Sequence, residues 1–107
     1  MPPYELTAYA QEDLADIIEY TAKNYGVAQA REYAAGLEKC ALNLASSQGY
    51  YRELKNVHPR LRVVRCQHHY IFGLMRTGQP MAAIAIFHER MDVLRRLKTR
   101  LKNPQDR

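Results

Sequence analysis

The chain has 107 residues, of which 47% are hydrophobic and 25% charged, so it has room for one globular domain with a modest core. It contains no apolar run of transmembrane length and no signal-peptide pattern at its start, and a cytoplasmic protein without membrane contact is expected. Its net charge is +5, and its second half carries the excess: residues 1–60 have 6 Lys and Arg against 8 Asp and Glu, whereas residues 61–107 have 10 against 3. This gradient favours an acidic partner, either nucleic acid or an acidic protein surface, although a solvated basic helix that aids solubility accounts for it equally well.

The first half of the chain predicts a strand and two helices. Tyr4–Thr7 alternates apolar and polar residues, as a short strand does, and Thr7 can cap the helix that follows. Apolar residues then recur at helical spacing up to Tyr25, and Gly26 is placed to end this helix. A second helix follows at once, with a narrow apolar seam from Val27 to Leu44, and the short connection predicts an antiparallel helical hairpin.

The second half predicts a three-stranded meander. Residues 50–60 show little periodicity and are expected to form a loop. Three runs rich in β-branched, aromatic or other apolar residues follow, separated by short turns, at 61–66, 69–75 and 81–87. The last run is seven apolar residues long, which is typical of an interior strand buried on both faces.

A basic segment continues directly from the last strand. Its apolar residues are spaced three or four apart, which predicts one buried helical face: Met91, Leu94, Leu97 and Leu101. Residues 103–107 are expected to be a frayed tail. The chain is therefore predicted to be one α+β domain, 1–107, with an N-terminal strand, an antiparallel helical hairpin packed on a mainly antiparallel four-stranded sheet, and a basic C-terminal helix or tail.

The two cysteines, Cys40 and Cys66, form neither a C-x-x-C motif nor a spaced framework. This usage predicts a reducing compartment and two small buried thiols, with a disulfide as the minor alternative. The adjacent residues His68 and His69 would point to opposite faces of a strand, so no metal site is predicted, and no motif indicates a cofactor.

His88 is the one residue that invites a catalytic interpretation, because it ends the buried strand beside the basic segment. A histidine there could transfer protons in phosphodiester cleavage, with Arg62 and Arg65 stabilising the negative charge of the transition state. The alternative is that His88 only hydrogen-bonds the junction between strand and helix, and local features favour this alternative. Arg62 is also compatible with a solvated strand end. Arg65 lies inside a predicted strand, where an unpaired charge would be costly, so it is expected to reach the rim of the sheet or a carboxylate.

The sequence also carries a set of residues that resembles a known toxin family. The matching pieces run from Tyr4 to about Leu97 and include Leu6-Thr7, Asp13-Leu14, Tyr20-Thr21, Gly26, Gln29-Ala30, Arg62-Val-Val-Arg65, His69-Tyr-Ile-Phe72 and Ile84-Ala-Ile-Phe-His88-Glu-Arg90-Met-Asp92. The closing His-x-Arg-Met-Asp is the most specific of them. Together these pieces resemble the ParE branch of the RelE/ParE toxin superfamily.

That resemblance implies the toxin of a bacterial type II toxin-antitoxin pair, neutralised when a small cognate antitoxin binds it directly. ParE-like toxins are associated with poisoning DNA gyrase, so the expected activity is binding rather than catalysis. We expect the target to be contacted by the basic segment, through Arg90, Arg95, Arg96, Lys98 and Arg100. The alternative implied by the RelE-like relatives is ribosome-dependent mRNA cleavage through His88, Arg62 and Arg65, and a third possibility is a nucleic-acid-binding module without toxicity.

Overall fold

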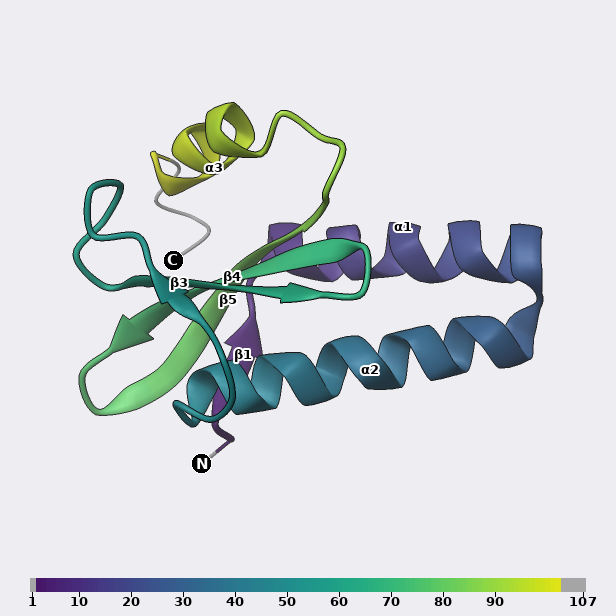
Figure 1. The fold of residues 1–107 in the computed structure, drawn as a ribbon, viewed down its shortest axis with the longest axis horizontal. Helices are drawn as coiled ribbons and strands as arrows, with labels where there is room; N and C mark the ends of the chain where they lie inside the picture. Colours follow the sequence, from purple (N-terminus) through teal and green to yellow (C-terminus); the bar gives the residue numbers. More distant parts are fainter. Residues whose placement is uncertain (1, 103–107) are drawn as a thin grey trace.

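The computed structural model describes residues 2–102 (Figure 1). Its elements follow the order β1 (Tyr4–Leu6), α1 (Ala8–Tyr25), α2 (Val27–Ala45), β2 (Arg52–Glu53), β3 (Leu61–Cys66), β4 (His69–Arg76), β5 (Gln79–His88) and α3 (Val93–Leu101). This confirms the predicted α+β fold, while the tail predicted at 103–107 lies outside the described residues. Among the described helices, none has the length and apolar character needed to cross a membrane.

The helical hairpin forms where the sequence predicts it. The side chain of Thr7 accepts a hydrogen bond from the amide of Ala10 and so caps α1. Between the helices Gly26 adopts a φ of 97°, a left-handed conformation that favours glycine. The one-residue connection turns α2 back along α1, and the pair projects beyond the sheet (Figure 1).

The sheet has five strands in the order β1-β5-β4-β3-β2, one more than predicted. β1 pairs parallel to β5, and the other pairings are antiparallel. The additional strand, β2, consists of Arg52 and Glu53 opposite Arg62 and Val63. Two residues are too few to show a period of two, so this edge strand could not be predicted from hydrophobic alternation.

Hydrophobic clusters lie on both faces of the sheet. On one face α2 contributes Leu37, Ala41 and Leu44. On the other face Leu97 of α3 is fully buried, and Figure 1 shows α3 on the side of the sheet away from α2. The sequence predicted helices against one face only, and it placed Leu94 on the buried side of the basic helix. That placement was wrong: Leu94 is 52% exposed, because the face of α3 that packs on the core is formed by Val93, Leu97 and Leu101, which follow one another four residues apart.

The cysteines form a disulfide, so the expectation of two free thiols was wrong. Cys40 of α2 and Cys66 at the end of β3 have Cα atoms 6.2 Å apart, within the range of about 4.4–6.8 Å that a disulfide spans. The two residues are 26 positions apart in sequence, and only the packing of α2 on the sheet brings them together.

The pairing of β4 with β5 is interrupted twice. Near the turn Arg76 lies opposite Gln79, and at the far end His69 lies opposite His88. Between these two pairs β5 contains two more residues than β4. Irregularities of this kind redirect side chains and are common beside functional sites. Here they place His69 and His88 on the same rung of the sheet.

Replacing Gly73 with alanine is expected to destabilise the fold by about 1–3 kcal/mol, because the added methyl group would overlap the thioether of buried Met81. Chemical denaturation measures this loss. In a double-mutant cycle with Met81→Ala, the two changes together should cost clearly less than the sum of the single changes, since truncating Met81 makes room for the methyl group. Strict additivity would contradict this contact.

Candidate functional site

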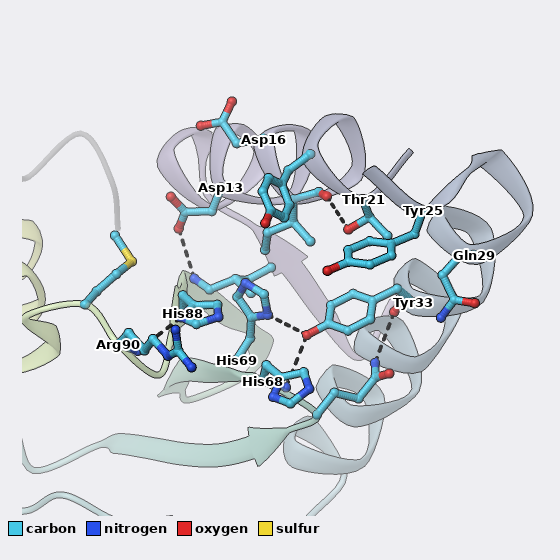
Figure 2. Close-up of a pocket in the computed structure, with 15 residues that line it drawn as sticks. Asp13, Asp16, Thr21, Tyr25, Gln29, Tyr33, His68, His69, His88 and Arg90 are labelled. Carbon is cyan, nitrogen blue, oxygen red and sulfur yellow. Dashed lines mark hydrogen bonds between the residues drawn. The ribbon is translucent and has the colours of Figure 1, made fainter. Parts of the chain in front are cut away.

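A groove of about 1010 Å³ lies between the helical hairpin and the end of the sheet (Figure 2). One side is formed by α1 and α2, and the other by the β3–β4 turn and the residues at the end of β5. The residues that define its polar character are Asp13, Asp16, Tyr20, Tyr25, Gln29, Tyr33, Gln67, His68, His69, His88 and Arg90. Tyr20 and Tyr25 are 61% and 69% exposed, which is unusual for aromatic side chains on helices that pack on a sheet.

Tyr33 of α2 connects the helical side of the groove to the β3–β4 turn. Its hydroxyl oxygen accepts the backbone amide of His68 at 3.2 Å and lies 2.6 Å from Nδ1 of His69 (Figure 2). Burial raises the pKa of Tyr33 above its ordinary value, so the hydroxyl keeps its proton at neutral pH. Because the oxygen already accepts one hydrogen bond, its proton can be donated to Nδ1, which leaves the proton of a neutral His69 on Nε2.

His69 and His88 face each other across neighbouring strands. Their ring centroids are 5.1 Å apart in an edge-to-face arrangement, and Nδ1 of His88 accepts the backbone amide of Arg90. Burial, together with the neighbouring His88 and His68, lowers the pKa of His69 to about 4. His69 is therefore neutral at physiological pH.

Neutral His69 is expected to make stability depend on pH. Its pKa is about 4 in the folded chain against 6.5 in the unfolded chain, so between these values the unfolded state binds more protons and stability rises with pH. We expect the wild type to lose about 1–2 kcal/mol more than His69→Gln when the pH falls from 7 to 4.5, after allowance for solvent screening. Urea denaturation at the two pH values measures this difference, and equal losses in the two proteins would contradict a buried neutral His69.

Glu89 links His68, in the β3–β4 turn, to Arg65 of β3. One carboxylate oxygen accepts from Nδ1 of His68 at 3.1 Å, and the other accepts from the guanidinium of Arg65. The hydrogen bond from His68 and the charge of Arg65 lower the pKa of Glu89. Arg65 is thus paired with a carboxylate on the exposed rim of the sheet, as expected for a charged residue inside a strand.

Asp13 and Arg100 form the most buried ion pair of the described part of the chain. Their side chains are 16% and 15% exposed, and the guanidinium makes two hydrogen bonds to the carboxylate. Asp13 also accepts the backbone amide of Ile86, and Arg100 donates to the carbonyl of Ile84. This cluster joins α1, β5 and α3 at one end of the groove.

The catalytic set considered from sequence is not gathered at one place. Arg62 lies opposite Gly73, four residues or roughly 13 Å along β3 from the rung that holds His88. It also donates hydrogen bonds to the carbonyl of Leu44 and the hydroxyl of Ser47, where it caps the end of α2. Arg65 precedes Cys66 on β3 and therefore points to the opposite face from the groove.

Most of the basic residues proposed as target contacts are exposed. The side chains of Arg90, Arg95, Arg96 and Lys98 are exposed, and Arg95 pairs with Asp92 on the surface. Arg100 differs from them, because its guanidinium is engaged by Asp13 and stacks on the rings of Tyr9 and Phe87. The structure therefore gives Arg100 a role in holding α3 on the sheet.

Sequence reasoning missed Tyr33 and His69 as members of the site. The pair His68-His69 was considered only as a metal site and was discounted. Within residues 2–102 the histidines, cysteines and acids form no group of three that could hold a metal ion. The partners of His69 come instead from α2 and β5, which no local motif could have indicated.

Comparison with known families gives a match over most of the chain. A family model described as the ParE toxin of type II toxin-antitoxin systems, parDE, matches residues 4–93. The chain is 47% identical over 102 residues to Toxin ParE of Escherichia coli, covering 95% of this chain and 99% of that protein. It is 30% identical over 92 residues to Toxin ParE1 of Caulobacter vibrioides, covering 86% and 94% of the two chains.

A solved structure shares the fold. The structure titled "Chromosomal ParDE TA system from P. aeruginosa" contains a chain that superposes with a TM-score of 0.65, covering 79% of this chain and 92% of that one. The sequence identity is 17%, so this likeness concerns the arrangement of helices and strands.

Proposed function

The chain belongs to the family of ParE toxins of type II toxin-antitoxin systems, and from this membership we propose that it arrests bacterial growth by binding DNA gyrase and blocking replication. The proposal includes a cognate antitoxin that neutralises the toxin by direct binding in the cytoplasm. The observation that supports this proposal most directly is the 47% sequence identity to Toxin ParE of Escherichia coli over almost the whole chain.

The exposed basic face of α3 supports a binding mechanism. Leu97 holds the helix on the sheet, so Arg95, Arg96 and Lys98 are left at the surface without a packing role. Clustered positive charge raises the rate and selectivity of association with an acidic surface. We assign the contact with the target to these three residues together with Arg90.

We propose that the antitoxin binds in the groove. Its exposed Tyr20 and Tyr25 offer apolar area on the hairpin, and Asp16, His68 and Arg90 offer polar groups that can fix the register of a bound segment. An amphipathic helix lying in such a groove gains most of its affinity from a few apolar anchors. A short acidic open reading frame directly upstream of the toxin gene is expected to encode this partner.

The ribonuclease alternative receives less support from the geometry. His88 has a histidine neighbour, but Arg62 and Arg65 are engaged elsewhere and do not converge on it. Proton transfer in cleavage needs its groups within reach of one scissile phosphate. A nuclease built on this site would have to use His88 with groove residues outside the set chosen from sequence.

Induced expression in cells without antitoxin tests the proposal. We expect filamentation and a DNA damage response with intact mRNA, as a block of replication requires. His88→Ala should then change toxicity only as far as it changes folding, because a binding toxin needs no proton-transfer group. Cleaved mRNA on stalled ribosomes, lost by orders of magnitude in His88→Ala, would instead establish the nuclease.

A further inference from the structure

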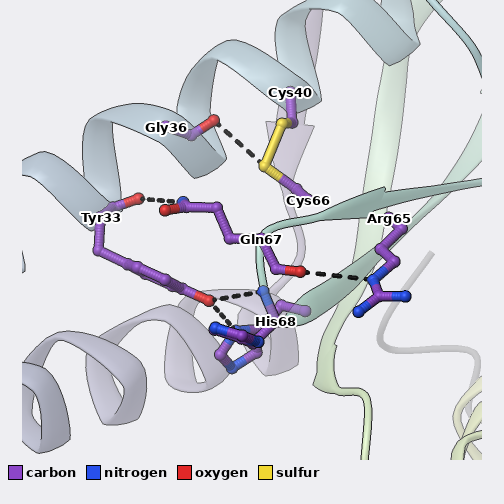
Figure 3. The surroundings of a disulfide bond; sticks show 8 residues. Tyr33, Gly36, Cys40, Arg65, Cys66, Gln67 and His68 are labelled. Carbon is purple, nitrogen blue, oxygen red and sulfur yellow. Dashed lines mark hydrogen bonds between the residues drawn. A yellow bond between two sulfur atoms is a disulfide. The ribbon is translucent and has the colours of Figure 1, made fainter.

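The disulfide lies directly before the turn that lines one side of the groove. Cys66 is the last residue of β3, and the next three residues, Gln67, His68 and His69, line the groove. Figure 3 shows Cys40 reaching from α2 to Cys66 beside this turn. The bond therefore fixes the point at which the turn begins.

Residues on one face of α2 make the contacts that fix the β3–β4 turn. Tyr33, Gly36 and Cys40 are three and four residues apart and so lie on the same helical face. Tyr33 binds the amide of His68 through its hydroxyl and the side chain of Gln67 through its carbonyl (Figure 3). A Cβ at Gly36 would lie 2.8 Å from Nε2 of Gln67, so glycine permits this close approach.

From this arrangement we propose that Cys40–Cys66 is a reversible thiol–disulfide site whose reduction by a dithiol loosens the Gln67–His69 turn and weakens the binding of antitoxin in the groove. The effect on antitoxin rests on the proposed function; the effect on the turn does not. In the reducing cytoplasm that this function implies, disulfides are typically transient or redox-sensing.

The two sulfur atoms are unequally accessible, which defines the course of the reaction. Cys66 is 4% exposed, whereas Cys40 is only partly buried. A thiolate of the dithiol attacks Sγ of Cys40, and Sγ of Cys66 leaves as a thiolate and takes up a proton. The second thiol of the reductant then displaces Cys40, so two electrons and two protons pass from the dithiol to the protein.

In the reduced state the buried thiol of Cys66 has a hydrogen-bond acceptor within reach. Sγ of Cys66 lies 3.4 Å from the carbonyl oxygen of Gly36, so a reduced Cys66 can donate a hydrogen bond without moving (Figure 3). The turn is then held to α2 by side-chain hydrogen bonds that contribute about 1 kcal/mol each. Reduction therefore leaves the fold intact while local opening of the turn becomes easier.

Hydrogen exchange of the full chain, measured in the oxidised state and after reduction with dithiothreitol, tests the first part. The amide of His68 donates a hydrogen bond to the hydroxyl of Tyr33, and we expect its exchange to accelerate about tenfold or more on reduction. Exchange at the amides of Ala83 and Ile86 should change far less. Cys40→Ser should match the reduced state under both conditions. Unchanged exchange at His68, or global unfolding of the reduced chain, would overturn the proposal.

Titration with the polypeptide encoded upstream tests the second part. The reduced toxin and Cys40→Ser should bind it about three- to tenfold more weakly than the oxidised toxin, because a loosened turn must be ordered on binding. Equal affinities, with faster exchange at His68, would overturn the link to antitoxin. Absence of binding in either redox state would instead overturn the proposed function, while the exchange result stands independently.

Discussion

Changing Arg95, Arg96 and Lys98 together to glutamate is expected to abolish growth inhibition while the protein still folds. The three side chains are exposed, and the surface pair of Arg95 with Asp92 contributes about 0–1 kcal/mol. The substitution lowers the net charge from +5 to −1 and reverses the potential of α3. Viable counts after induction measure toxicity, and circular dichroism measures the fold.

A matched variant separates local charge from total charge. Lys23, Arg31 and Lys39 are exposed on the helical hairpin, and changing them to glutamate alters the net charge by the same amount. This variant should remain toxic. Undiminished toxicity of the α3 variant, or equal loss in both, would remove α3 as the target-binding surface.

Asp13→Ala is expected to lower the free energy of unfolding by about 3 kcal/mol, because it leaves the guanidinium of Arg100 without its carboxylate in a mostly buried site. The amide of Ile86 loses its acceptor in the same change. For a domain of this size the melting temperature should fall by on the order of 15 °C. Calorimetry measures both quantities.

Asp16→Ala provides the control for this prediction. Asp16 lies on the same helix and beside the same groove but is exposed, so its removal should change the melting temperature little. Comparable losses in the two variants would show that the contacts of Asp13 with Arg100 and Ile86 contribute nothing beyond helix electrostatics.

The helices and the long strands could be predicted because their signals are local. Thr7 and Gly26 mark the ends of α1 through capping chemistry, and seven consecutive apolar residues identify the interior of β5. Each of these features depends on residues within one or two turns of the same element. β2 lacked such a signal because it is two residues long.

The site depends on pairings that local patterns do not contain. A regular hairpin after the Arg76–Gln79 pair would place His69 opposite Ile86, and the two irregularities in the ladder shift its partner to His88. Tyr33 has no polar partner nearby in sequence, and only the packing of α2 over the β3–β4 turn brings its hydroxyl to the amide of His68. The disulfide and the Asp13–Arg100 pair likewise join residues that only the assembled fold brings together.

The most direct test of the account is a DNA supercoiling assay with purified gyrase and the purified toxin. We predict that the toxin inhibits supercoiling, that the variant with Arg95, Arg96 and Lys98 changed to glutamate does not, and that His88→Ala inhibits as the wild type does. Full supercoiling activity in the presence of excess folded toxin would contradict gyrase as the target.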